Sequence, residues 1–176
     1  MERFLKFLLG VTVAIWLGMA VFFTFAAGPA FFSEPMLEIF KKAGATEPKQ
    51  FSGLVAMMML AKYYHWNYVC GALALLLLLA EKWILGHPVR KVGLVAAVLA
   101  LGLAAVAAQG IQPRLHGLYQ VKYDVQRPES ERVTAGKQFG ALHGISQILN
   151  LAAIASLLVL AWSVTKRSPD VTSRNT

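Results

Sequence analysis

The sequence predicts an all-α membrane protein, a four-transmembrane-helix antiparallel bundle, and two observations support this fold class. First, 57% of the 176 residues are hydrophobic and the mean hydropathy is +0.55, so the chain is more apolar than a typical soluble domain. Second, the apolar residues gather into four runs, each near the ~20 residues that cross about 30 Å of hydrocarbon. We expect membrane spans at residues 4–27, 63–82, 92–109 and 139–164, polar loops at 28–50 and 110–138, and one integral membrane domain over 1–176.

The net charge of +8 does not indicate nucleic-acid binding. No run of basic residues is longer than two, whereas a nucleic-acid-binding protein shows a clustered basic face. The basic pairs stand at or between the span ends, where positive charge anchors helices and meets anionic lipid. The expected partners are therefore the lipid bilayer and a protein partner or a second copy of the chain, with no nucleic acid.

The distribution of basic residues also predicts an orientation. They lie close to the spans on the side that holds both termini and the turn between the second and third spans. Such residues favour the cytoplasmic side. We therefore expect an integral protein of the bacterial inner membrane with its N- and C-termini in the cytoplasm.

The first span is expected to end at Gly28-Pro29, because proline has no N–H and stops the helical hydrogen-bond ladder. The residues that follow, 31–50, should form a loop with one interfacial turn of helix. One face of the first span combines small and aromatic residues within about 60° of helical arc, which predicts a helix–helix contact. Its members are Gly18, Phe22, Phe25 and Pro29.

The second apolar stretch is interrupted near Lys62 by aromatic residues that mark a membrane–water interface. We expect residues 51–61 to lie outside the hydrocarbon or at the headgroups, the span to begin at Tyr63, and Glu81 to mark the opposite interface. The turn to the third span is short, so these two helices are antiparallel neighbours. The third span carries small residues at a spacing of four, which lets backbones approach closely. These are Ala96, Ala100, Ala104 and Ala108.

The fourth span carries a polar stripe, formed by His143, Ser146, Gln147 and Asn150. These positions fall at i, i+3, i+4 and i+7, on one helical face about 100° wide. Such groups are costly in lipid, so we expect the stripe to face protein. Two interpretations remain open: the side chains hydrogen-bond to neighbouring helices, or they line a small polar cavity.

Four further polar residues are expected on the same side of the membrane as His143 and could support a site. These are Asn67, Gln109, His116 and His65. Neutral imidazole is a common metal ligand, and His143 is the best candidate. However, the chain has no His-x-x-x-His pair and no Cys–His cluster, and the one carboxylate within the span bounds, Glu81, stands at the expected interface. No cofactor is therefore predicted, and haem or copper stays an alternative.

Two motifs together resemble a known family. The first runs Trp16-Leu-Gly18-x-x-x-Phe22-x-x-Phe25-x-x-x-Pro29-Ala-Phe31, and the second runs Phe139-x-x-Leu-His143-Gly144-x-Ser146-x-x-x-Asn150. The chain, over roughly residues 5–162, is similar to a four-helix membrane family of unknown function, domain of unknown function 4149, related to eukaryotic transmembrane protein 205. The resemblance implies an integral membrane protein of four helices without an established activity.

A more distant architectural resemblance is to four-helix copper-resistance membrane proteins and to the haem-dependent protoporphyrinogen oxidase of bacteria. That resemblance would imply metal or haem held through histidines, but this chain has no histidine in its first helix.

No hydrolase, phosphate-loop or dinucleotide motif is present, so we do not expect an enzyme. The leading hypothesis is a non-enzymatic membrane protein, a packing or accessory component or one that interacts with lipid. The alternatives are a haem- or copper-binding membrane protein and a small-solute transporter.

Overall fold

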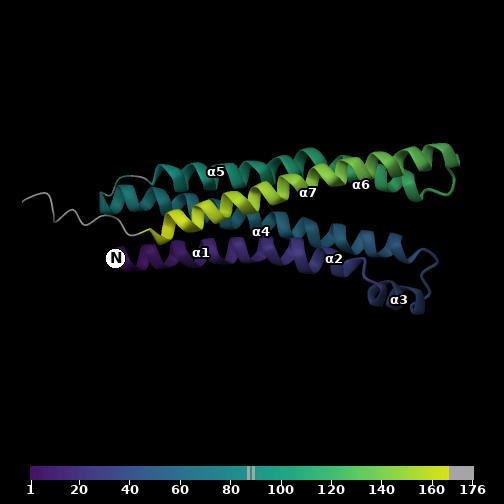
Figure 1. Cartoon of the computed structure of the whole chain (residues 1–176), viewed down its shortest axis with the longest axis horizontal. Coiled ribbons are helices and arrows are strands. Elements are labelled where there is room, and N and C mark those ends of the chain that lie inside the picture. Colours follow the sequence, from purple (N-terminus) through teal and green to yellow (C-terminus); the bar gives the residue numbers. More distant parts are fainter. Residues whose placement is uncertain (87, 89, 167–176) are drawn as a thin grey trace, which may run out of the picture.

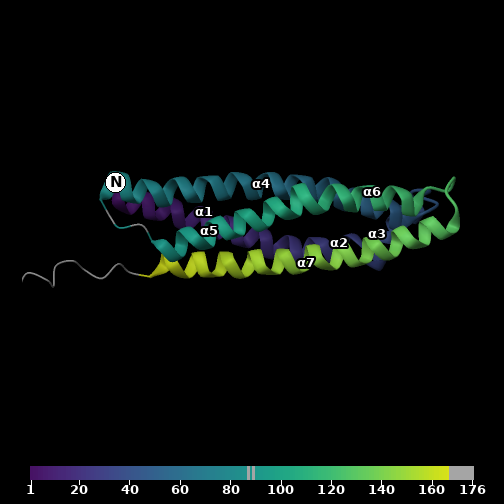
Figure 2. The same ribbon diagram turned by 90° about the horizontal axis from the view of Figure 1, so that it is seen from above.

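The computed structural model describes residues 1–86, 88 and 90–166 and shows long helices lying side by side along one axis (Figures 1 and 2). In chain order the elements are α1 (Glu2–Phe22), the π-helical η1 (Phe23–Ala27), α2 (Gly28–Phe31), α3 (Glu34–Lys42), α4 (Pro48–Leu85), α5 (Lys91–Ala105), the π-helical η2 (Val106–Ile111), α6 (Gln112–Tyr123) and α7 (Glu129–Thr165).

Four long helices make up the bundle, as the sequence predicted. The runs α1–η1–α2 and α5–η2–α6 are each continuous, and with α4 and α7 they are the four candidate membrane spans by length and composition. Successive long helices run antiparallel, so the N-terminus and the end of α7 lie at the same end of the molecule (Figure 1). The predicted fold class is therefore confirmed.

The helices are longer than the hydrophobic runs that predicted them. The candidate spans hold 30, 38, 33 and 37 residues, and a rise of ~1.5 Å per residue makes the last three roughly 50 Å long or more. About 30 Å of hydrocarbon cannot cover them. The bundle is therefore longer than such a layer is thick, so part of it must lie outside the hydrocarbon.

The predicted polar loop at 110–138 is mostly helix, which corrects the prediction. α6 and the first part of α7 occupy it, and the two helices pack together. Leu115 and Tyr119, one helical turn apart on α6, are 3% and 5% exposed. A high mean hydropathy indicates that a segment is apolar enough to lie in lipid. It does not detect an amphipathic helix, which packs through one apolar face and carries polar residues on the other.

The loop predicted at 28–50 is also largely helical. The first helix does not stop at Pro29, because η1 widens the turn before it and the Gly28 N–H bonds to the Phe23 carbonyl, five residues back. A π-bulge of this kind relieves the clash that proline makes with the preceding turn. α3 then packs against α4, and residues 51–61 continue α4 as regular helix.

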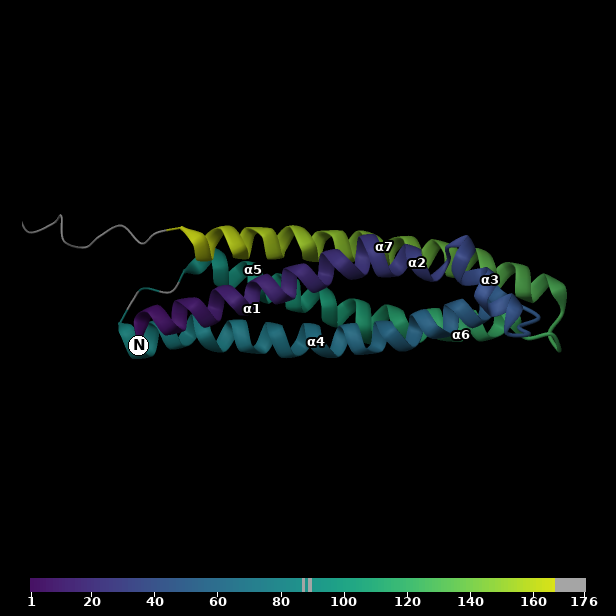
Figure 3. The ribbon, with the colours of Figure 1, turned by 90° about the horizontal axis from the view of Figure 1, so that it is seen from below.

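The arrangement of the bundle follows from which helices touch. α1 packs against α4 and α7, and α5 packs against the same two helices. α1 runs obliquely between its two neighbours (Figure 3). The core along these contacts contains the most deeply buried large side chains of the bundle: Leu9, Trp16, Leu78, Leu157 and Leu160.

The two predicted packing faces differ in outcome. On α5, Ala96, Ala100 and Ala104 are buried, and Ala108 in η2 is half-buried. The face of the first helix formed by Gly18, Phe22, Phe25 and Pro29 instead lies on the outside of the bundle. The buried face is Leu9, Thr12, Val13, Trp16 and Ala20.

The helix–helix contact predicted for the Gly18, Phe22, Phe25 and Pro29 face of the first helix is therefore wrong within a single copy of the protein. Phe22 and Phe25 are 65% and 63% exposed. The physical reason is that lipid tails are as apolar as leucine, so apolar character alone does not say which face of a membrane helix packs on protein.

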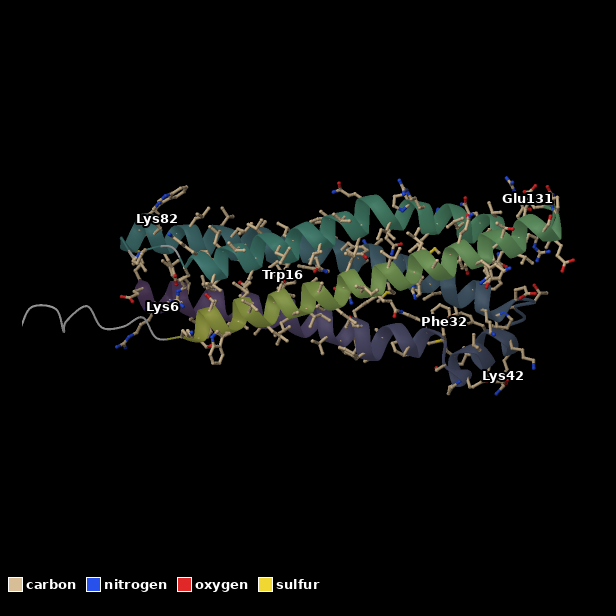
Figure 4. All side chains as sticks on the ribbon, turned by 45° about the horizontal axis from the view of Figure 1, so that its top comes forward. Lys6, Trp16, Phe32, Lys42, Lys82 and Glu131 are labelled. Carbon is tan, nitrogen blue, oxygen red and sulfur yellow. The ribbon has the colours of Figure 1, made fainter. Side chains whose placement is uncertain are left out.

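Charged side chains occupy the two ends of the bundle. Lys6 and Lys82 lie at the end with the N-terminus, Lys42 and Glu131 lie at the opposite end, and Trp16 lies between them (Figure 4). This distribution matches an apolar middle flanked by two polar regions, as expected of a chain that crosses a bilayer.

A tight approach of helices at Gly71 in the core gives a test of the packing. A Cβ added at Gly71 of α4 would lie 2.7 Å from Leu101 Cδ1 and 3.1 Å from Trp16 Cη2. We expect Gly71→Leu to lower the free energy of unfolding by about 1–3 kcal/mol, because it overpacks this contact. Thermal unfolding followed by circular dichroism in detergent measures the loss.

The matched control is Gly102→Leu on α5, where no atom of another described helix lies within 4 Å of an added Cβ. Equal unfolding midpoints for the two variants would contradict a tight α1–α4–α5 contact.

Candidate functional site

A series of hydrogen-bonded polar side chains crosses the middle of the bundle, beginning at Trp16 of α1. Its indole Nε1 donates a hydrogen bond to Asn67 Oδ1 of α4 at 2.8 Å. The Asn67 amide nitrogen in turn donates to the Tyr63 carbonyl oxygen, one turn back on α4, at 2.9 Å. Both polar ends of the Asn67 side chain are therefore used within the protein.

The hydrogen-bonded series continues from α4 to α7 and from there back to the first helix. The Tyr63 hydroxyl donates to Asn150 Oδ1 at 3.0 Å, and Asn150 Nδ2 donates to Thr24 Oγ1 at 2.5 Å. The Thr24 hydroxyl donates to the Ala20 carbonyl oxygen at 2.6 Å. The Tyr63 ring also stacks on Phe23, with centroids 4.6 Å apart and planes 16° apart.

We call Trp16, Thr24, Tyr63, Asn67 and Asn150 the central network. Three of the four long helices contribute to it, and Trp16, Tyr63 and Asn67 are buried. Buried polar groups are costly unless they find partners. Among the described residues, the one buried side-chain nitrogen or oxygen without a hydrogen-bond partner is Glu81 Oε1, which lies outside the network. Every buried side-chain nitrogen and oxygen of the network therefore has a hydrogen-bond partner within the protein.

The predicted polar stripe of α7 divides between two environments. Asn150 enters the central network, and half-buried Ser146 interacts with the Tyr64 hydroxyl, which also reaches Gln112. His143 and Gln147 are exposed and bond to each other, with Nε2 atoms 3.0 Å apart. The prediction that the whole stripe faces protein is wrong for these two residues.

The division follows from helical geometry. At about 100° per residue, Ser146 and Asn150 lie on one side of His143 and Gln147 lies on the other. The stripe thus straddles the edge of the helix–helix contact. The His143 ring is covered on one side by Phe139, whose ring stacks on it with centroids 5.8 Å apart and planes 6° apart.

The remaining predicted site residues, apart from Asn67, do not join the network. His65 and His116 are exposed. The His65 and Trp66 rings lie edge to face, with their centroids 6.1 Å apart. Gln109 is exposed and donates to the Tyr68 hydroxyl at 3.4 Å. Within the described part of the chain, no three His, Cys, Asp or Glu residues form a group that could hold a metal ion; His87 lies outside that part.

One polar contact escaped the sequence analysis. Glu81, expected at a membrane interface, is 6% exposed, and its Oε2 lies 3.4 Å from Arg90 Nε. Arg90 Nη1 donates to the carbonyl oxygens of Ser163 at 2.7 Å and Val164 at 3.1 Å. Arg90 therefore ties the end of α4 to the last turn of α7, whose carbonyls lack helical partners. The signal in the sequence is one acid and one arginine flanking a short turn.

The sequence did not predict three residues of the central network, of which Trp16 and Tyr63 had a weak signal and Thr24 had none. Trp16 stood in a motif that carried a family resemblance, Tyr63 looked like an interfacial aromatic, and Thr24 had no distinguishing neighbour. An aromatic ring with one polar atom suits both an interface and a buried hydrogen bond. Sequence alone does not separate these roles.

Comparison with known proteins identifies one family. The family model described as "Domain of unknown function (DUF4149)" matches residues 11–124. The match runs from within α1 to the end of α6, includes Trp16, Tyr63 and Asn67, and ends before α7. No curated protein and no solved structure matches the chain.

Removing the amide of Asn150 tests the central network. Asn150→Leu removes the acceptor of the Tyr63 hydroxyl and the donor to Thr24. We expect the free energy of unfolding to fall by about 1–3 kcal/mol, because buried Tyr63 loses its partner. Thermal unfolding in detergent micelles measures the change.

Gln147→Leu serves as the control on the same helix. Gln147 is exposed and its hydrogen bond runs to His143, so we expect a change within about 0.5 kcal/mol. Destabilisation by Gln147→Leu as large as that by Asn150→Leu would mean that the stripe, and not the network, stabilises the bundle.

Proposed function

Because the chain belongs to the DUF4149 family, whose function is unknown, we propose its role from its own geometry: it is a non-enzymatic integral membrane protein that acts through its outer surface. In this role it is a packing or accessory component that contacts lipid, another membrane protein or a second copy of itself. Kinship with eukaryotic transmembrane protein 205 is part of the proposal, on the two motifs that begin at Trp16 and Phe139.

The observation that carries the proposal is the closure of the central network. An active or transport site needs polar groups that a substrate can reach, in a concave site. Here Trp16, Asn67, Tyr63 and Asn150 bond to one another across the bundle. These side chains support a structural role in the interior, which leaves the surface of the bundle for interaction.

The outer surface offers much apolar area to lipid or to a partner. Large side chains such as Phe22, Phe25 and Ile148 are 63–67% exposed. Apolar surface of this extent on a soluble protein would mark an interaction site, and on a bundle of membrane helices it suits lipid. We propose the bacterial inner membrane as its location, with both termini in the cytoplasm.

Purification of the full chain in mild detergent tests the proposal. We expect a folded protein without a haem absorption band and without a stoichiometric transition metal, because the central network is complete without either. The measurements are the visible spectrum, the metal content and the mass spectrometry of copurifying proteins and lipids.

Two results would replace the proposal by one of its alternatives. A Soret band or bound copper that is lost in His143→Ala would establish a cofactor-binding protein. Solute flux in proteoliposomes that is absent in Asn150→Leu would establish a transporter.

A further inference from the structure

A groove runs along the outside of the bundle between α5 and α7, at the end that holds both chain termini. Its volume is about 460 Å³, within the ~300–1,000 Å³ of ordinary ligand sites. Eight residues line it: Lys91, Val92, Val95, Ala96, Leu99, Ala155, Ser156 and Val159. One end of this set is cationic, and the rest is almost wholly apolar.

The walls of the groove offer no polar partner along their length. Val92, Val95 and Leu99 of α5 are 62%, 64% and 52% exposed, and Val159 of α7 is 45% exposed. The hydroxyl of Ser156 donates to the Ala152 carbonyl oxygen at 2.8 Å, so it is already used within α7. A ligand that fills the groove must therefore be apolar over this length.

Lys91 supplies a positive charge at the mouth of the groove. It is exposed, and no hydrogen bond or ion pair joins it to another residue of the described part of the chain. Three other cations at this end already have partners: Lys6 pairs with Glu2 at 2.6 Å, Arg90 pairs with Glu81 at 3.4 Å, and Lys166 Nζ lies 5.3 Å from the Trp162 ring centroid. The Lys91 ammonium is therefore available to an anion.

The length of the groove matches one leaflet of a bilayer. Lys91 and Leu99 are eight residues apart, or about 12 Å along α5. Half of the hydrocarbon thickness is roughly 15 Å. A groove of this length that begins at the lipid headgroups would end near the bilayer midplane.

We propose that this groove holds an acyl chain of an anionic phospholipid, with the lipid phosphate at Lys91, a site that rests on the proposed function and deepens it. The occupant carries its charge at one end and is apolar beyond it, as the groove requires. A packed helix is a poorer fit, because about 12 Å is only two helical turns, whereas a stable protein interface buries roughly 1,200 Å² or more.

Native mass spectrometry of the full chain in mild detergent tests the charged end. The probes are phosphatidylglycerol and phosphatidylcholine with identical acyl chains. We expect phosphatidylglycerol to bind about fivefold more tightly, the effect of one basic residue near anionic lipid. Lys91→Gln should abolish that preference. Lys82→Gln, an exposed lysine at the same end outside the groove, should retain it.

Substitutions on the walls test the apolar part. Ala155→Phe fills the groove from α7 at an exposed position and should reduce the binding of both lipids. Val95→Phe fills it from α5 and should do the same if Ala155→Phe fails to fold. Ala72→Phe is the matched control, because Ala72 is exposed on α4 and does not line the groove.

Three results would overturn the lipid site. They are equal binding of the two lipids by the unmodified chain, equal loss in Lys91→Gln and Lys82→Gln, and unchanged binding in both groove-filling variants. A protein partner displaced by Ala155→Phe, with lipid binding unaffected, would also overturn it. A haem band or bound copper would defeat the proposed function without changing these lipid ratios, so the two failures are distinguishable.

Discussion

The structure depends on hydrogen bonds that link helices across an apolar interior. In lipid, the hydrophobic effect does not drive one helix against another, because the tails are as apolar as the side chains. Association then relies on close backbone approach and on polar groups that are costly to leave unpaired. The contacts from Trp16 to Asn67 and from Tyr63 to Asn150 supply such links between α1, α4 and α7.

Small residues provide the close helix–helix contacts that act together with the central network. The buried alanines of α5 and the close contact at Gly71 bring the third long helix against its neighbours. At the end of the bundle that holds both termini, Arg90 donates hydrogen bonds to carbonyl oxygens in the last turn of α7, which have no partner within the helix. The interior is thus closed by contacts within the chain, and the groove beside Lys91 lies outside it.

Hydropathy predicted the four spans and their antiparallel order because the requirement for about 20 apolar residues is set by the bilayer. It could not predict α6 or the first part of α7, since those helices are stabilised by packing of residues such as Leu115 and Tyr119. Periodicity placed Asn150 and Ser146 on one face but could not decide on which side of the contact His143 and Gln147 would fall. That depends on the position of α1 and α4, which no local pattern encodes.

A double-mutant cycle between Tyr63→Phe and Asn150→Ala tests most directly whether the central network holds the helices together. The two side chains are 3.0 Å apart and lie on different helices. Interhelical hydrogen bonds in membranes average about 0.6 kcal/mol, with a maximum near 1.7. We predict a coupling free energy of unfolding within this range. A coupling indistinguishable from zero would contradict the account.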